Sequence, residues 1–195
     1  MKKLLLSTFI ATALTTPQVF AQAKNFEGFS LYGGVNLANS TLEQNPKNGF
    51  SNASVTSSSS NFGLQAQYTL AVGNSVAVGF GASMGLGDLV FGRWVASGID
   101  IKLKDTSSIY VAPGYAINDT TLLYGKIASV TGAAADTTSV SLSGLGYGVG
   151  AQIMMNKNTF YQFEWMQSNY SDKDFPTVVD KFKSSALSVG VGYKF

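Results

Sequence analysis

Strict alternation in the C-terminal segment constrains the fold of this chain more than any other feature. Between positions 187 and 195 every second residue is apolar, and the residues between them are small or charged. A repeat of two indicates a β-strand with two different faces. Soluble proteins seldom end on a long strand with one fully apolar face, whereas a membrane β-barrel needs such a strand to close on its first one. The apolar residues are Leu187, Val189, Val191, Tyr193 and Phe195.

The same alternation recurs in seven earlier segments, which together predict an all-β fold. The connections between the segments are short and long in turn, and no apolar run is long enough for a membrane-spanning helix. Short turns at one end and long loops at the other predict an eight-stranded antiparallel up-and-down transmembrane β-barrel. The predicted strands are 29–37, 61–70, 75–87, 107–117, 121–130, 140–153, 159–167 and 182–195.

The residues opposite the bulky apolar ones are small, which separates a membrane barrel from two soluble alternatives. A secreted β-sandwich or a lipocalin-like barrel would bury the bulky face and expose the other face to water. That other face is rich in Gly and Ala and almost free of charge, so it would be a poor water-facing surface. Bulky residues in lipid and small residues in a narrow lumen explain the pattern better. The glycines on the predicted lumen face are Gly79, Gly81, Gly85, Gly144, Gly146, Gly148, Gly150, Gly190 and Gly192.

The first 21 residues predict a secretory signal peptide, followed by one barrel domain, residues 22–195. Two lysines precede a mostly apolar stretch, and Val19-Phe20-Ala21 offers a small-residue cleavage site before Gln22. Cleavage after Ala23 is the alternative. The apolar stretch is too short to cross a membrane as a helix. We therefore expect export through a cleaved signal peptide.

Three motifs resemble the small bacterial outer-membrane β-barrel family, which includes the OmpA-like transmembrane domain and the opacity-protein-like porins. They are Phe29-Ser30-Leu31-Tyr32-Gly33-Gly34, Leu123-Tyr124-Gly125-Lys126 and Gly192-Tyr193-Lys194-Phe195. The resemblance covers nearly the whole mature chain and implies a place in the bacterial outer membrane, with the short turns and both termini in the periplasm. It also implies three partners: outer-membrane lipid, lipopolysaccharide and the barrel-assembly machinery. The closing-strand residues for assembly would be Val189, Val191, Tyr193 and Phe195.

Lys126 and Glu164 are the charged residues at mid-strand positions. A charge at mid-membrane depth on the lipid face costs about 2–4 kcal/mol, which places Lys126 in the lumen. A buried charge needs a partner, and side chains of non-neighbouring strands can meet across a small lumen. We predict that Lys126 and Glu164 pair, as a plug that holds the lumen shut or as the gate of a small conductance. The glutamines expected nearby are Gln65, Gln67, Gln152 and Gln162.

The chain contains neither cysteine nor histidine, which excludes most site chemistry. Without cysteine it has no disulfide framework and no thiolate metal site. Without histidine it lacks the usual metal ligand and the usual base at neutral pH. Loss of the two signal-peptide lysines lowers the basic count from 13 to 11, which equals the 11 acidic residues. We expect no enzyme activity, no cofactor or metal, and no nucleic-acid partner, because that partner would need a clustered basic face.

The long connections are 38–60, 88–106, 131–139 and 168–181. We expect 38–60, rich in Ser and Asn, to be a flexible exposed segment. The apolar run 89–95 is either a strand extension that packs above the membrane or a tip that contacts a partner or lipid. Asp172 and Asp174 are better explained as solvated charges than as a cation site. Pro113, at an outward mid-strand position, predicts a β-bulge because it removes a ladder donor.

These features favour a non-enzymatic outer-membrane barrel that stabilises the envelope or presents its loops for adhesion or recognition. An extracellular ligand of the loops is then a further expected partner. The alternative is a pore for small solutes: eight strands enclose a lumen that side chains can just fill, but the many inward glycines could leave a channel. A lipid-acting enzyme is the weakest alternative, because the chain lacks histidine. The fold alone does not choose among these functions.

Overall fold

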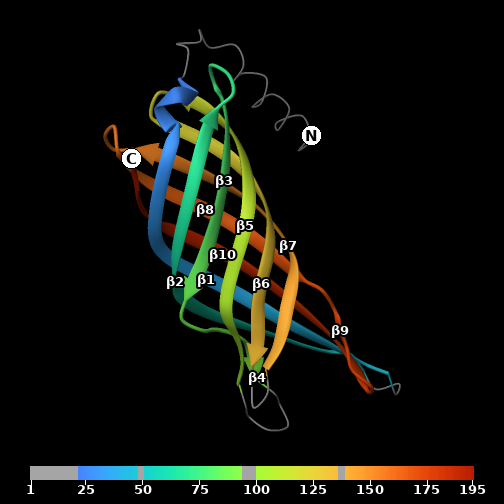
Figure 1. Ribbon diagram of the computed structural model, residues 1–195. Coiled ribbons are helices and arrows are strands. Elements are labelled where there is room, and N and C mark those ends of the chain that lie inside the picture. Colours follow the sequence, from blue (N-terminus) through green and yellow to red (C-terminus); the bar gives the residue numbers. More distant parts are fainter. Residues whose placement is uncertain (1–21, 48–50, 94–99, 136–138) are drawn as a thin grey trace, which may run out of the picture.

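Nearly all of the described chain forms antiparallel β-strands, as the alternating pattern predicts. The computed structural model describes residues 22–47, 51–93, 100–135 and 139–195, so the predicted signal peptide lies outside the described residues. Within these ranges no helix is long and apolar enough to cross a membrane. A short 3-10 helix, η1 (Ala23–Phe26), precedes the first strand. The strands of Figure 1 are β1 (Gly28–Pro46), β2 (Ala53–Ala71), β3 (Val76–Leu86), β4 (Leu89–Arg93), β5 (Asp100–Asn118), β6 (Thr121–Ala135), β7 (Ser139–Met154), β8 (Thr159–Tyr170), β9 (Lys173–Asp174) and β10 (Val178–Lys194).

The sheet closes on itself because the first long strand pairs with the last. β1 pairs with β10 from Ser30↔Lys194 to Pro46↔Val178, and its other edge pairs with β2. Around the ring the order is β1-β2-β3-β5-β6-β7-β8-β10, and every pairing is antiparallel. The short strands β4 and β9 are additions at one end. The predicted eight-stranded up-and-down barrel is therefore confirmed.

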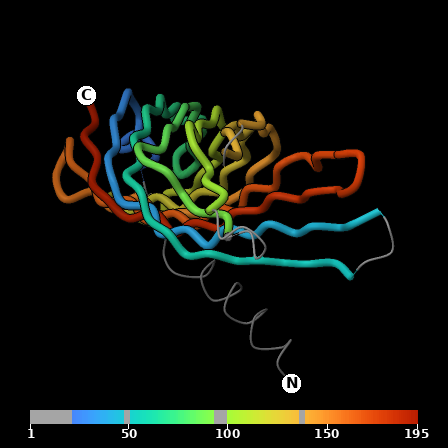
Figure 2. Tube along the Cα trace, turned by 90° about the horizontal axis from the view of Figure 1, so that it is seen from below, coloured from blue at the N-terminus to red at the C-terminus, as the bar shows by residue number. Residues whose placement is uncertain are grey.

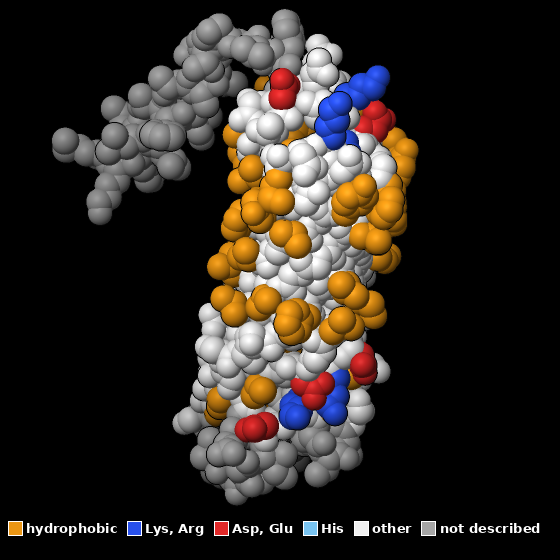
Figure 3. Space-filling model, turned by 90° about the vertical axis from the view of Figure 1, so that its left-hand side faces the viewer, with side chains coloured by type: hydrophobic (Ala, Val, Ile, Leu, Met, Phe, Trp, Pro, Cys, Tyr) orange, Lys and Arg blue, Asp and Glu red, His pale blue; other side chains and the backbone are white. Residues whose placement is uncertain are grey.

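The two faces of each strand point as the sequence predicts. Outward apolar side chains are exposed, for example Phe62 at 66% and Leu145 at 67%, while inward residues such as Tyr110 at 7% are buried. Figure 3 shows the result on one face of the molecule: hydrophobic side chains cover a middle zone, and charged side chains lie at the two ends. An apolar belt between charged rims is typical of a barrel that spans a bilayer.

All four predicted long loops are largely β-structure instead. Segment 38–60 was expected to be flexible, but β1 continues to Pro46 and β2 begins at Ala53, in continuous register down to Gln44↔Ala53. Polar cross-strand pairs hold this hairpin together: Thr41 and Thr56 hydroxyls lie 2.8 Å apart, and Ser58 donates to Asn39 at 2.6 Å. β5 likewise begins at Asp100 and β10 at Val178. Figure 2 shows the β1–β2 hairpin and the β8–β10 connection extending well past the rest of the ring.

The predicted bulge at Pro113 is wrong. Pro113 pairs with Val78 in unbroken register on the β3 side, and the β5–β6 register is the same before and after it. The proline is accommodated on an outward position by leaving adjacent ladder positions unpaired. Register shifts in the β5–β6 pair lie at 104–107 and 116–118 instead. The first contains Asp105, which has a φ of 51° and is the positive-φ non-glycine residue of the described chain.

Candidate functional site

The structure brings Lys126 of β6 and Glu164 of β8 together inside the barrel. Nζ of Lys126 lies 2.8 Å from both carboxylate oxygens of Glu164. Their side chains are only 2% and 6% exposed. On the described strands between the two charged rims, these are the charged side chains. A bidentate contact at this depth joins two strands that β7 separates in the ring, so it crosses part of the lumen.

The surrounding polar groups complete the coordination of both charges. Lys126 also donates to the side-chain oxygen of Gln65 at 3.0 Å, and its ammonium lies 3.9 Å from the centre of the Tyr110 ring. The Tyr124 hydroxyl donates to Glu164 at 2.8 Å. Hydrogen bonds and a cation–π contact of this kind compensate two charges for the loss of water.

The other predicted glutamines occupy separate places in the lumen. Gln67 accepts a hydrogen bond from the Tyr110 hydroxyl at 3.1 Å, so it joins the ion pair through that ring. Gln152 donates a hydrogen bond to Gln162 at 3.0 Å, and this bond is separate from the contacts of the ion pair. The network therefore reaches strands β2, β5, β6 and β8, and the role of its ion pair stays a prediction.

Inward glycines leave less open space than the sequence suggests, because aromatic rings lie against them. A Cβ atom at any of four glycines would collide with such a ring. Sequence reasoning placed Gly81, Gly150 and Gly192 in the lumen but missed that aromatic rings fill the space above them. The signal was present, since Tyr32 and Tyr110 fall on inward positions of their strands. The pairs are Gly34 with Tyr32, Gly81 with Tyr110, Gly150 with Tyr124 and Gly192 with Phe160.

An apolar cap closes the end of the lumen that carries the long connections. β4 places Phe91 inside the barrel with no exposed surface. Its ring centre lies 5.1 Å from that of Phe182 and 6.3 Å from that of Tyr170. The predicted packing of segment 89–95 thus holds for its described part, while residues 94 and 95 lie outside the described residues. Further side chains of the cap are Leu42, Leu89, Ile101, Leu103 and Leu142.

A cavity of about 120 Å³, lined by both polar and apolar side chains, lies between the cap and the ion pair. Glu164 and Gln65 line it on one side, and Leu89 and Leu103 on the other. At about 10–15 Å³ for each water it has room for several waters. The Tyr32 hydroxyl, which also lines it, is buried without a protein hydrogen-bond partner. A water in this cavity would satisfy that group.

At the cap and beyond it, β1, β2 and β10 form a sheet with a mixed-charge surface, which we call the outer sheet (β1 39–46, β2 53–60, β10 178–185). Lys183 donates to Glu43 at 2.8 Å, and this contact lowers the pKa of the Glu43 carboxyl. Burial raises the pKa of Asp180, although Gln44 donates to it at 3.0 Å. Asp172 and Asp174 of the neighbouring connection contact Lys181 and Lys47. No cluster of potential metal ligands occurs within the described ranges.

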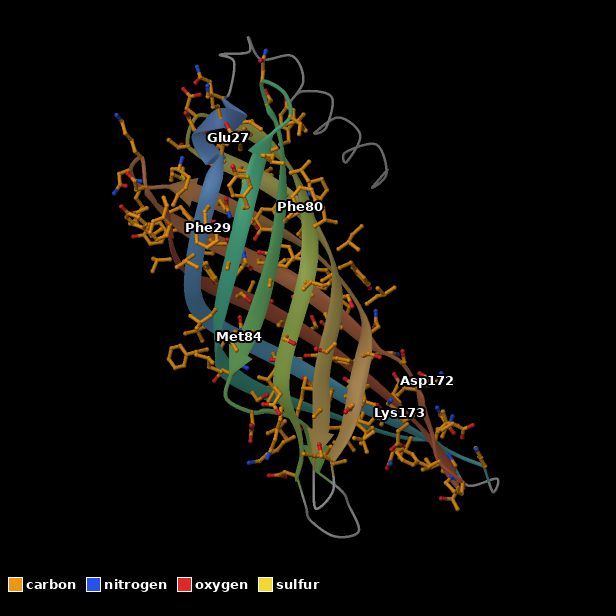
Figure 4. The ribbon with its side chains drawn as sticks, viewed as in Figure 1. Glu27, Phe29, Phe80, Met84, Asp172 and Lys173 are labelled. Atoms are coloured by element: carbon orange, nitrogen blue, oxygen red, sulfur yellow. The ribbon has the colours of Figure 1, made fainter. Side chains whose placement is uncertain are left out.

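The predicted closing-strand residues all lie on the outer face of β10. Val189, Val191, Tyr193 and Phe195 are 39%, 50%, 49% and 67% exposed. The Phe195 amide donates to the carbonyl of Phe29 at 2.9 Å, and the two rings lie 5.8 Å apart. In Figure 4, Phe29 and Glu27 lie at this end of the barrel, while Asp172 and Lys173 lie at the opposite end. The strand closes the ring, and its role in assembly stays a prediction.

Comparison with known proteins agrees with this geometry. The family model for the outer membrane protein beta-barrel domain matches residues 4–195. Ail of Yersinia pestis, solved in complex with the heparin analogue sucrose octasulfate, is 18% identical with a TM-score of 0.51, over 87% of this chain and 99% of that one. OprG of Pseudomonas aeruginosa is 14% identical with a TM-score of 0.51, over 91% and 99%.

Neisserial surface protein A is 17% identical with a TM-score of 0.51, over 87% of this chain and 100% of that one. No curated protein matches the chain in sequence. At these identities the structural likeness establishes the fold and not the role, since one fold serves many functions.

Proposed function

The chain belongs to the outer membrane protein beta-barrel domain family, and we propose that within it this protein is a closed, non-enzymatic barrel that acts through its outer sheet. The family places it in the bacterial outer membrane. The observation that carries the proposal is the occupied lumen. The Lys126–Glu164 pair lies inside it at mid-depth, and the cap around Phe91 fills one end. A barrel closed in this way has its accessible chemistry on the outside.

The outer sheet is the part of the molecule suited to structural or recognition work outside the membrane. It extends past the apolar belt, and its hydroxyl, amide and charged side chains stand on a rigid ladder rather than on a loose loop. Rigid presentation lowers the entropy that recognition must overcome. Lipid contacts the apolar belt, and lipopolysaccharide and the assembly machinery remain expected partners.

Conductance tests the closed barrel. The mature chain, refolded until its gel mobility is heat-modifiable, is measured in a planar bilayer. We expect no steady openings, because side chains fill the lumen of eight strands. Reproducible single-channel steps from the folded form would contradict the proposal.

Binding tests the outer surface. The similar Ail structure holds a heparin analogue, so a polyanionic saccharide is the first probe. We expect vesicles carrying the protein to be retained on immobilised heparin, and retention to fall for the double variant Lys181→Gln/Lys183→Gln. Lys157→Gln, at the short-turn end, is the matched control. Equal retention of all three proteins would reject recognition of this ligand class while leaving the structural role.

A pore for small solutes is the second candidate, and the cavity in the lumen favours it. A cavity of about 120 Å³ already lies in the lumen, next to the ion pair. If this candidate is correct, Glu164→Gln increases the frequency of openings, because Lys126 loses its bidentate partner. Unchanged silence in this folded variant would remove the pore.

A further inference from the structure

Residues 22–27 cover the short-turn mouth of the barrel. In η1, Ala23 has no exposed surface and Phe26 is 3% exposed. Both pack against Ala77, Ala116 and Leu122, which are inward residues of three strands. This plug lies at the opposite end from the Phe91 cap, so the lumen is covered at both ends. Sequence reasoning missed it, because two apolar residues in a four-residue helix carry no periodic signal.

Polar contacts fix the same segment to three separate parts of the rim. The Ala23 amide donates to the carbonyl of Asn74 in the β2–β3 turn at 2.7 Å. The Asn25 side chain donates to the carbonyl of Asp119 in the β5–β6 turn at 3.1 Å. Nζ of Lys194, at the end of β10, donates to the carbonyl of Asn25 at 2.6 Å. The segment therefore has a defined seat on the barrel.

Gln22 itself contacts an acidic side chain: its backbone nitrogen lies 3.2 Å from Oδ1 of Asp119. Hydrolysis of the Ala21–Gln22 peptide bond adds one water, leaving a carboxylate on Ala21 and an amino group on Gln22. At neutral pH that amino group is largely a cation, and it would already lie at ion-pair distance from Asp119. Cleavage after Ala23 would instead remove both the fully buried Ala23 and its bond to Asn74.

We propose that the exported chain is cleaved after Ala21 and that Asp119 binds the amino group of Gln22, so that the new amino terminus holds the plug of the periplasmic mouth. Asp119 is then the acceptor of an intramolecular ligand, a primary ammonium group created by processing. The geometry selects between the two cleavage sites that the sequence leaves open, because only the first retains every contact of the seat.

The first test is the intact mass of the mature protein purified from outer membranes. A mass for residues 22–195 with a free amino group supports the proposal. A chain that begins at Lys24 overturns it. A mass lower by one ammonia also overturns it, since cyclised Gln22 has no amino group to bind.

The second test measures the ion pair in the folded protein. The rate at which a neutral-pH reagent acylates the Gln22 amino group is followed by peptide mapping. Asp119→Asn should raise the rate by roughly two- to fivefold, the range for an exposed ion pair. Asp88→Asn is the matched control, because Asp88 contacts Lys102, 3.4 Å away, at the opposite end. Equal rates in wild type and Asp119→Asn would overturn the proposed binding role of Asp119.

Discussion

Two ion pairs in this molecule have the same length and opposite surroundings. Lys126 and Glu164 meet at 2.8 Å in the lumen, with side chains 2% and 6% exposed. Lys183 and Glu43 meet at 2.8 Å on the outer sheet, with side chains 46% and 35% exposed. Distance alone would rank them as equals. The two pairs differ in their exposure to solvent: water screens the outer pair and is largely excluded from the inner one.

The difference concerns what each pair would leave behind if it were broken. In the outer sheet a released charge is solvated, so the pair contributes little to the free energy of unfolding. In the lumen a released charge stays buried without a counter-ion, so either residue depends strongly on the other. The inner pair is therefore a constraint on the closed state of the lumen, and the outer pair is a local feature of the surface.

The largest expected effect is from Glu164→Ala. Lys126 would keep only Gln65 and the Tyr110 ring, and the Tyr124 hydroxyl would lose its acceptor. We expect the free energy of unfolding to fall by about 3–5 kcal/mol. Urea titration of the barrel in lipid vesicles measures this change.

The double variant Lys126→Met/Glu164→Leu is the control for that prediction, because it removes both charges. Its loss of unfolding free energy should be clearly smaller than the sum of the losses of Lys126→Met and Glu164→Leu. Additive losses would mean that the two side chains do not depend on each other, and the contrast between the pairs would disappear.

Phe91→Ala comes next and tests whether the cap closes the lumen independently of the ion pair. The buried ring contacts Phe182 and Tyr170, and its removal leaves a void next to the cavity in the lumen. We expect a loss of about 3 kcal/mol in the same urea titration, at the lower end for a buried Phe because the mouth can partly collapse. Phe62→Ala, an exposed ring on the lipid side, is the control. An equal loss in both variants would show that Phe91 is not a special closure.

The sequence predicts the lumen only for the part of each strand that lies in the lipid, because there the lipid constrains which residues can face outward. Outward residues must be apolar in the belt, so alternation gave the strands and forced Lys126 inward. Above the belt this constraint on outward residues is absent. The Ser-rich outer part of β2 (53–60) therefore has no alternating pattern that would distinguish a paired strand from a loop. The packing of the Tyr110 ring on Gly81 and of the Tyr124 ring on Gly150 depends on cross-strand register, which alternation does not specify.

Gly150→Val tests the packing of the Tyr124 ring on Gly150. A side chain there would displace the Tyr124 ring, whose hydroxyl donates to Glu164. We expect a loss of about 1–3 kcal/mol from overpacking, with the ion pair still formed. Gly73→Ala, in a turn where an added Cβ would lie 3.9 Å from the Cβ of Val76, an ordinary van der Waals contact, is the control. A neutral Gly150→Val in the urea titration would imply that the lumen has free room beside the inner pair.

Glu43→Gln measures the outer pair directly. The contact with Lys183 lowers the pKa of Glu43 from its ordinary value of 4.5. Its small stabilisation is therefore present above that value and is lost as the pH falls through the lower folded pKa. We expect the variant to lose less than about 1 kcal/mol at pH 7, and the loss to shrink with added salt. A loss as large as that of Glu164→Ala would refute the role given to solvent.

Asp180→Asn sharpens the comparison. Burial disfavours the charged form of the Asp180 carboxyl, and Gln44, a neutral donor, contacts it. Its side chain lies in the outer sheet, yet the residue is only 6% exposed. A raised pKa on an acid means that the folded state binds the proton more tightly, so this group favours folding as the pH falls through that raised value and opposes it at neutral pH. Asparagine keeps an oxygen for Gln44 and removes the charge. We expect no loss, or a gain below about 1 kcal/mol, at pH 7, and a smaller advantage over wild type at pH 4. A clear loss at pH 7 in paired urea titrations would mean that the Asp180 charge is itself stabilising, and burial would no longer explain the contrast between the two ion pairs.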